Sequence, residues 1–185
     1  MDFETFIPNV LRTEATLPAD KTIQKQRLTM AFILAARAAE VLNLFKRELV
    51  YNKELETDLL DTYLQEIESF GDMIRSLKNE TPVSLSEIGV DPRKIHALIG
   101  MTTEGGEIGK EAAQWLDTGF LSDLNVGAEM GDFNYYQGLW CHAAGIQQGS
   151  ILDLVVSKLN LKFPEGYDEN LADNRDITLD ANILK

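Results

Sequence analysis

The stretch KIHALIGMTTEGGEIGKEAAQWL, residues 94–116, decides the fold class of this chain. Its apolar residues recur at the spacing of an amphipathic helix, and Glu104 and Glu107, three positions apart, lie on one face of that helix. Between them stand Gly105 and Gly106, and each glycine inside a helix costs about 1 kcal/mol relative to alanine. We therefore expect another helix or a ligand to approach this face closely.

Apolar residues at helical spacing recur along the rest of the chain. The alternating pattern of a half-buried strand is absent, and all five prolines lie outside the strongly periodic segments. The sequence therefore predicts an all-α protein, a helical bundle. The expected helical segments are 22–49, 54–78, 93–116, 121–146 and 149–161.

A turn-rich segment divides the chain near its middle. Residues 79–92, NETPVSLSEIGVDP, contain two prolines and several turn residues. We expect an N-terminal helical half over residues 1–85 and a C-terminal half over residues 86–185 that ends in a polar tail. The two halves are expected to form one compact domain.

The two halves suggest an internal repeat. A shift of 67 positions places residues 27–49 on residues 94–116, and a shift of 60 positions aligns parts of the helices that follow. On this hypothesis the first half is a degenerate copy that has lost two of four carboxylates. Chance similarity between amphipathic helices is the alternative. The shifts pair Glu40 with Glu107, Asp72 with Asp132, Arg37 with Glu104 and Ser69 with Glu129.

Composition excludes several classes of partner. A formal net charge of −13 argues against a broad nucleic-acid surface, which needs stripes of lysine and arginine. The longest apolar run, residues 30–36, is far shorter than the roughly 18 residues of a membrane span, and the start of the chain lacks signal-peptide features. The single cysteine, Cys141, excludes an intrachain disulfide and fits a reducing cytosol. We expect a cytoplasmic protein with neither a membrane nor a nucleic-acid partner.

Four carboxylates form the candidate site, which we call the acidic quartet: Glu104, Glu107, Glu129 and Asp132. They form two pairs with i, i+3 spacing, and a short turn near residues 116–125 would bring the two helices antiparallel so that their acidic faces meet. Four facing carboxylates cannot all stay ionised without a cation between them. Ligation by oxygen alone favours Mg²⁺ or Mn²⁺. The alternative is a pair of ordinary solvated acidic faces.

The residue patterns required for a di-iron centre or for a serine or cysteine nucleophile are absent from the sequence. A di-iron carboxylate bundle needs Glu-x-x-His, but Arg93 stands three positions before His96 and Leu139 three before His142. No Ser-His-Asp or Cys-His nucleophile is visible, because Cys141 and His142 are sequence neighbours that diverge by about 100° on a helix. We interpret Cys141 as a core residue and His142 as a helix residue without a catalytic role.

The acidic quartet, together with the downstream segment KLNLKFPEGYDENLADNRD at residues 158–176, resembles the MazG-like nucleotide pyrophosphohydrolases. These belong to the all-α NTP pyrophosphatase superfamily, and the form resembled is the one common in phage genomes. The resemblance covers about residues 94–180. It implies hydrolysis of a ribo- or deoxynucleoside triphosphate to monophosphate and pyrophosphate, with a metal-activated water as nucleophile. It also implies a homo-oligomer, expected to be a dimer, located in the host cytoplasm if the protein is phage-encoded.

The resemblance assigns roles to individual residues. All four members of the acidic quartet would hold Mg²⁺ or Mn²⁺, and Glu104 or Glu107 would also orient or deprotonate the attacking water. Lys158, Lys162 and Arg175 match basic positions that contact the phosphates, although solvent-exposed charge is their alternative interpretation. Two departures from the family pattern are Thr103, where a first glutamate is usual, and Val155, where an asparagine is frequent.

The base pocket and the physiological role stay open at this point. Four aromatic residues near the acidic helices could stack on a base, but aromatics at helical spacing are more often core. They are Trp115, Phe133, Tyr136 and Trp140. The alternative functions are a non-catalytic helical protein for nucleotide sensing or oligomerisation, and a hydrolase of another nucleotide such as a diphosphate or a guanosine alarmone.

Overall fold

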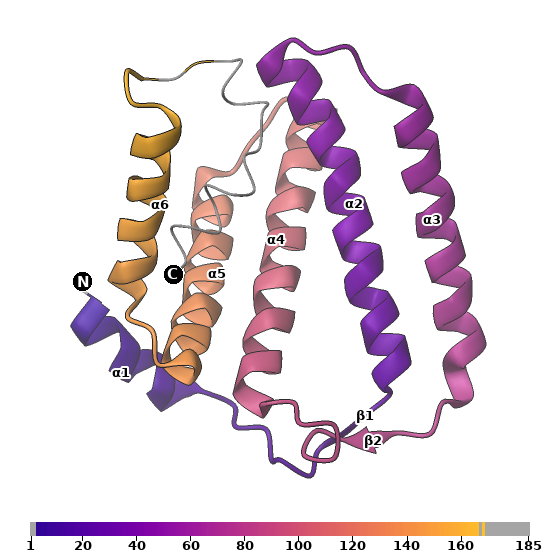
Figure 1. Cartoon of the computed structure of the whole chain (residues 1–185), viewed down its shortest axis with the longest axis vertical. Coiled ribbons are helices and arrows are strands. Elements are labelled where there is room, and N and C mark those ends of the chain that lie inside the picture. The colour runs from indigo at the N-terminus through magenta and orange to yellow at the C-terminus, as the bar shows by residue number, and fades with distance from the viewer. Residues whose placement is uncertain (1–2, 167, 169–185) are drawn as a thin grey trace. The chain divides into compact units, whose positions relative to one another are not determined.

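The computed structural model describes residues 3–166 and residue 168 (Figure 1). Within these residues the protein is all-α, as predicted, with only a two-residue pair of strands. The helices are α1 Phe3–Thr13, α2 Lys25–Tyr51, α3 Thr57–Ser76, α4 Pro92–Thr118, α5 Asp123–Ala144 and α6 Gln148–Lys162; the short 3₁₀ turn η1 covers Leu77–Asn79, and strands β1 Thr22–Ile23 and β2 Val83–Ser84 pair antiparallel.

The described residues form two compact units. One unit contains residues 3–21 and 89–164, and the other contains residues 22–88 with the short described segment after residue 164. The boundary at residues 88 and 89 lies in the turn-rich segment 79–92. Helix α1, in contrast, packs on α5 and belongs to the unit that contains residues 89–164. Helix α1 was not predicted, because Pro8 lies inside it.

The α4–α5 hairpin is delimited by capping residues. The Asp91 side chain accepts a hydrogen bond from a backbone N–H in the first turn of α4 (2.9 Å), and Ser122 accepts one at the start of α5 (3.3 Å). Gly119 ends α4 in the left-handed conformation (φ 73°), which glycine adopts without the usual steric cost. The four-residue turn 119–122 therefore makes α4 and α5 antiparallel, as expected from the sequence (Figure 1).

The core of the first unit lies where α1, α4 and α5 meet. Val10, Ala97 and Leu139 are almost fully buried there. Helix α1 can approach α5 closely because position 138 is glycine: a Cβ built on Gly138 would lie 3.1 Å from side-chain carbons of Phe6 and Ile7. The close helix–helix contact thus occurs at Gly138 rather than at the glycines between the glutamates.

The second unit is the α2–α3 hairpin. The start of α2 is held by Glu80, whose carboxylate accepts hydrogen bonds from the backbone N–H groups of Gln26 (2.7 Å) and Arg27 (3.0 Å). Across the hairpin, Arg37 Nε lies 2.6 Å from Glu66 Oε2. This ion pair joins α2 to α3.

The helix bounds test the proposed repeat. Helices α2 and α4 each span 27 residues, and both ends differ by 67 positions, which agrees with the first alignment. Helices α3 and α5 begin 66 positions apart, which contradicts the shift of 60. Asp72 lies 15 residues into α3 and Asp132 nine residues into α5, a displacement of about 9 Å along the axis. The pairing of Asp72 with Asp132 is therefore wrong.

Helix α2 is also the one described helix whose length and composition would allow it to cross a membrane. Its most apolar 18-residue window has a mean hydropathy of 1.6, although the longest uninterrupted apolar run is short. One such helix near the N-terminus is weak evidence, because core helices of soluble proteins and signal sequences meet the same criterion. The expectation of no membrane partner stays a prediction.

Candidate metal centre

Three of the four predicted ligands converge in the structure. We call Glu104 on α4 together with Glu129 and Asp132 on α5 the acidic triad; one carboxylate oxygen from each lies within 4.8 Å of the other two. Glu129 and Asp132 share one face of α5 because they are three residues apart, and the antiparallel hairpin brings Glu104 opposite them. Glu104 and Glu129 are half-buried, whereas Asp132 is exposed.

Glu107 stands outside this convergence in the described structure. Its Oε1 atom lies 2.5 Å from Lys110 Nζ, one turn further along α4. This i, i+3 ion pair holds the Glu107 carboxylate along its own helix. Its negative charge nevertheless acts on Glu129, so Glu107 borders the acidic triad.

The surroundings of Glu129 disfavour the ionised form of its carboxyl group. Partial burial raises the pKa of Glu129 above its ordinary value of 4.5, and a hydrogen bond shared with Glu104 raises this pKa further. The negative charges of Glu104, Glu107 and Asp132 add to the same shift. A cation placed among these oxygens would oppose every repulsive contribution.

The donor set fits a hard divalent cation. Two ligands on opposite sides of Mg²⁺ lie about 4.2 Å apart, since each Mg–O distance is about 2.1 Å. The carboxylate spacing of up to 4.8 Å is slightly wider, and small rotamer changes, for example of the exposed Asp132, would narrow it. Carboxylate oxygens are also the ligands that Mg²⁺ and Mn²⁺ prefer.

Tyr136 borders the triad, one helical turn beyond Asp132. Its ring lies against Gly100, where an added Cβ would collide with the ring carbons, and it makes edge contacts with the rings of His96 and Tyr135. Burial raises the pKa of Tyr136, and the charges of Glu104 and Asp132 raise it further. The sequence contained one indication that Tyr136 borders the triad: Tyr136 follows Asp132 by four positions, which places the two residues on the same face of α5.

The glycines between the glutamates do not have the predicted role within this chain. A Cβ built on Gly105 or on Gly106 would meet no heavy atom within 4 Å, and both residues are exposed. Within the described part of the chain, the expected close approach of another helix to these two glycines is therefore not found, and the approach of a ligand stays a prediction. The glycine that is required for packing on α4 is Gly100, one turn earlier than Glu104.

The predicted phosphate-binding residues lie on and beyond α6. Helix α6 runs antiparallel to α5 (Figure 1). Measured along the helix axes from the turn that connects α5 and α6, Lys158 and Lys162 lie about 15–21 Å away. Asp132 and Glu129 lie about 18–22 Å from the same turn along α5. The lysines and the triad are thus at a similar level along these helices. Arg175 lies outside the described residues.

The structure also tests which cysteine and aromatic side chains belong to the core. Cys141 is a buried core residue, as predicted, and burial raises the pKa of its thiol. Trp140 packs against the core, as does Tyr136. Trp115, by contrast, is 50% exposed, so its core interpretation is wrong within the described chain.

Comparison of the chain with known protein families, with curated proteins and with solved structures gives no match. Any functional assignment therefore depends on the residues and their geometry, together with the motif resemblance described above.

Proposed function

We propose that this protein is a metal-dependent nucleotide pyrophosphohydrolase of the MazG-like type, which cleaves a ribo- or deoxynucleoside triphosphate to monophosphate and pyrophosphate. The single observation that carries the proposal is the convergence of Glu104, Glu129 and Asp132 across the α4–α5 hairpin. Three of the four carboxylates predicted from sequence spacing thus lie together, although they come from two different helices. The raised pKa of Glu129 is consistent with the proposal: burial contributes most to it, and the hydrogen bond with Glu104 and the neighbouring negative charges add to it.

The acidic triad would hold Mg²⁺ or Mn²⁺. When bound, this ion would supply Lewis acidity and positive charge that offsets the charge of the phosphates. Glu107 would join as a fourth ligand or accept a proton at its carboxylate, which pairs with Lys110 in the described conformation. Glu104 would hold the cation and orient the attacking water.

Cationic side chains would complete the neutralisation of a triphosphate. Lys158 and Lys162 share one face of α6, four positions apart, at the level of the triad along the helices. Their ammonium groups and the guanidinium of Arg175 would contact the phosphates. The Tyr136 ring, fixed against Gly100, would limit how far the carboxylates of the triad can move.

A homodimer is part of the proposal. Few hydrophobic side chains are buried in the described chain, whereas several large ones at the α4–α5 turn are more than half exposed. Exposed apolar patches of this kind mark interaction surfaces. A second copy would also supply the close approach that Gly105 and Gly106 lack here. The exposed residues concerned are Leu116, Phe120 and Leu124.

A nucleotide panel tests the proposed reaction. The full chain is incubated with ribo- and deoxynucleoside triphosphates, diphosphates and a guanosine alarmone in Mg²⁺ or Mn²⁺, and pyrophosphate and orthophosphate are measured separately. Pyrophosphate from a triphosphate supports the proposal, while orthophosphate alone contradicts it. The matched variants are Glu104→Gln, expected to be inactive, and Glu111→Gln, expected to be active because Glu111 binds Asn125 (3.3 Å) outside the triad.

A further inference from the structure

Helix α6 carries a row of apolar side chains that stay about half exposed. Leu152, Val156 and Leu159 stand at positions i, i+4 and i+7, which places them on one side of the helix; we call them the α6 stripe. Each is between 48% and 55% exposed, and Gln148 is the one buried residue of α6. In Figure 1, α6 lies beside α5 at the edge of its unit. A helix with this much apolar surface normally packs against a further element.

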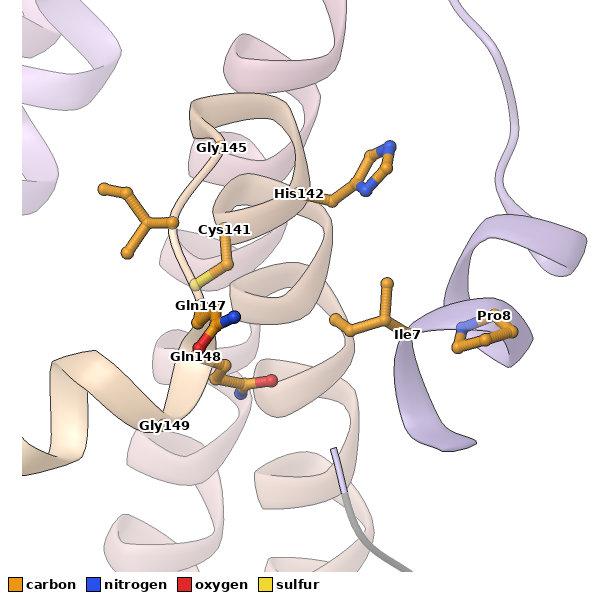
Figure 2. A pocket seen from close by; sticks show the side chains of 9 residues that line it. Ile7, Pro8, Cys141, His142, Gly145, Gln147, Gln148 and Gly149 are labelled. Carbon is orange, nitrogen blue, oxygen red and sulfur yellow. The ribbon is translucent and has the colours of Figure 1, made fainter. Parts of the chain in front are cut away.

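The α6 stripe continues into a cavity of about 540 Å³ between the end of α5, the start of α6 and helix α1 (Figure 2). Gln148 and Gly149 line this cavity, and Leu152 follows them by four and three positions on the same side of α6. Figure 2 shows the Ile7 side chain extending from α1 toward α5. We call the stripe and the cavity together the α6 surface. The residues that line the cavity are Ile7, Pro8, Cys141, His142 and residues 145–149.

The chain continues beyond α6 with enough residues to cover this surface. Residues 164–166 form a turn after the helix, in which Gly166 has a φ of 106°. Residues 167–184 can span up to about 60 Å when extended. Helix α6, in contrast, is only about 22 Å long. The end of the chain can therefore reach back along α6 as far as the cavity.

This last segment carries apolar residues in a suitable register. Ile177, Leu179 and Ile183 are separated by even numbers of positions, so an extended backbone directs all three to one side. Three such residues are too few to predict a strand of a sheet, but they give the segment one apolar edge. The residues between them include Asp180 and Asn182, which an extended backbone directs to the opposite side.

We propose that residues 177–183 of this chain dock on the α6 surface, with Ile183 in the cavity and Leu179 on the α6 stripe. In an extended segment these two residues lie about 13 Å apart. Along α6, the cavity residue Gly149 and the stripe residue Leu159 lie about 15 Å apart. The apolar spacing of the segment therefore matches that of the surface.

Charge complementarity supports the same register at the other end of α6. Asp176 lies about 23 Å from Ile183 in an extended segment. Lys162 lies about 20 Å from Gly149 along α6, so docking places a carboxylate at the level of an ammonium group. The covalent connection also gives the segment an effective concentration of about millimolar at this surface, which favours it over a second copy of the chain.

Docking would also affect the proposed function, on which this one step rests. Arg175 precedes Asp176, so the docked segment brings its guanidinium to the level of Lys162. Lys162 in turn lies at a similar level to the acidic triad along the helices. Docking therefore accounts for the way in which a cation beyond the end of α6 would act on the same phosphates as Lys162.

Disulfide trapping in the full chain tests the docking. The key pair is Gly149→Cys with Leu184→Cys, since Leu184 neighbours Ile183. The control pair is Gly127→Cys with Leu184→Cys. A Cβ built on either glycine meets no heavy atom within 4 Å, and Gly127 lies about 21 Å from Cys141 along α5, far from the cavity. After mild oxidation, non-reducing electrophoresis and peptide mass spectrometry identify the bonds.

The key pair should form an intrachain disulfide at least about tenfold faster than the control pair, because docking raises the local thiol concentration. A bond between the thiol at position 184 and Cys141, which lines the same cavity, would also support docking. Equal rates for the two pairs, or no intrachain bond, would overturn the proposal. Covalent dimers in place of the intrachain bond would overturn it too, and would assign the α6 surface to a second copy.

Hydrogen–deuterium exchange supplies a second measurement without cysteines. Ile183→Glu removes the apolar anchor and should speed exchange of the α6 backbone amides by about threefold or more. Its control, Asn182→Glu, adds the same charge on the opposite side of the segment and should leave this exchange nearly unchanged. Equal α6 exchange in wild type and Ile183→Glu would contradict docking.

Pyrophosphate release in Mg²⁺ is assayed separately, so that the two proposals can fail independently. A trapped intrachain bond in a chain that releases no pyrophosphate from any triphosphate would contradict only the proposed function. Pyrophosphate release by a chain that shows neither trapping nor the exchange difference would contradict only the docking.

Discussion

Glu104 on α4 and Glu129 on α5 bring carboxylate oxygens within 4.8 Å of each other across the hairpin. The two residues are 25 positions apart in the sequence, and the capped four-residue turn between the helices is what brings them together. Burial raises the pKa of Glu129, and the contact with Glu104 raises it further, so the ionised form of Glu129 is disfavoured in the folded protein.

The pH dependence of stability should reveal this shift. Because the folded-state pKa of Glu129 lies above its ordinary value of 4.5, the folded state holds this proton more tightly than the unfolded state. In EDTA, the stability contributed by this site should therefore fall as the pH rises from about 4.5 through the raised pKa. Glu129→Gln removes the titration, so its melting temperature minus that of wild type should increase with pH across this window. A difference that stays constant with pH would contradict the raised pKa.

Substitutions in the acidic triad should abolish metal binding, whereas substitution of Glu107 should abolish turnover but leave most of the metal binding. Glu104→Gln or Asp132→Asn should remove the increase in melting temperature that Mn²⁺ or Mg²⁺ gives to wild type, because each removes a ligand charge. Glu107→Gln should abolish turnover yet keep most of that increase, since Glu107 pairs with Lys110 outside the triad. Differential scanning fluorimetry with and without metal, combined with pyrophosphate release, measures both. If Glu107→Gln loses the metal effect as completely as Glu104→Gln, all four carboxylates act as ligands.

Two glycine substitutions on one helix should have opposite effects. Gly100→Ala places a methyl group into the Tyr136 ring and should lower the free energy of unfolding by about 1–3 kcal/mol. Gly105→Ala points into open space in the described chain and should raise it by about 1 kcal/mol, through helix propensity. Chemical denaturation of both variants tests this contrast. A destabilising Gly105→Ala would instead indicate that a second copy packs on this face.

The exposed apolar side chains at the α4–α5 turn should mediate dimerisation. Leu116 is 87% and Leu124 is 83% exposed, and exposed apolar side chains gathered in a patch mark interaction surfaces. Size-exclusion chromatography with light scattering should therefore give twice the chain mass of 20.7 kDa. Leu116→Glu or Leu124→Glu should shift the species toward the monomer. A wild-type monomer at micromolar concentration would contradict the proposed dimer.

The carboxylate of Glu40 in the first half should be dispensable for catalysis. It accepts a hydrogen bond from Asn43 on its own helix, and among the described residues no acidic group of α3 joins it in a metal-type cluster. Glu40→Gln should therefore retain most activity, in contrast to Glu104→Gln. A loss of activity at both positions, with both proteins folded, would show that the first half supplies a second acidic site.

The local physics of the chain determined most of the secondary structure. Apolar periodicity located five of the helices to within a few residues, because their apolar side chains recur at helical spacing, and Asp91, Gly119 and Ser122 cap α4 and α5. Helix α1 was not predicted, because Pro8 stands in the middle of this short helix and proline is unfavourable inside helices. The i, i+3 spacing of the carboxylates likewise required only helical geometry.

The tertiary structure decided which of those residues meet. The distance between Glu104 and Glu129, the diversion of Glu107 to Lys110 and the contact of Tyr136 with Gly100 all depend on how two helices cross, which sequence spacing does not encode. The cavity around Gln148 was invisible in the sequence for the same reason, because its wall joins α1 to residues more than 130 positions later. Spacing along one helix is a local property, whereas packing between helices depends on side chains that are distant in the chain.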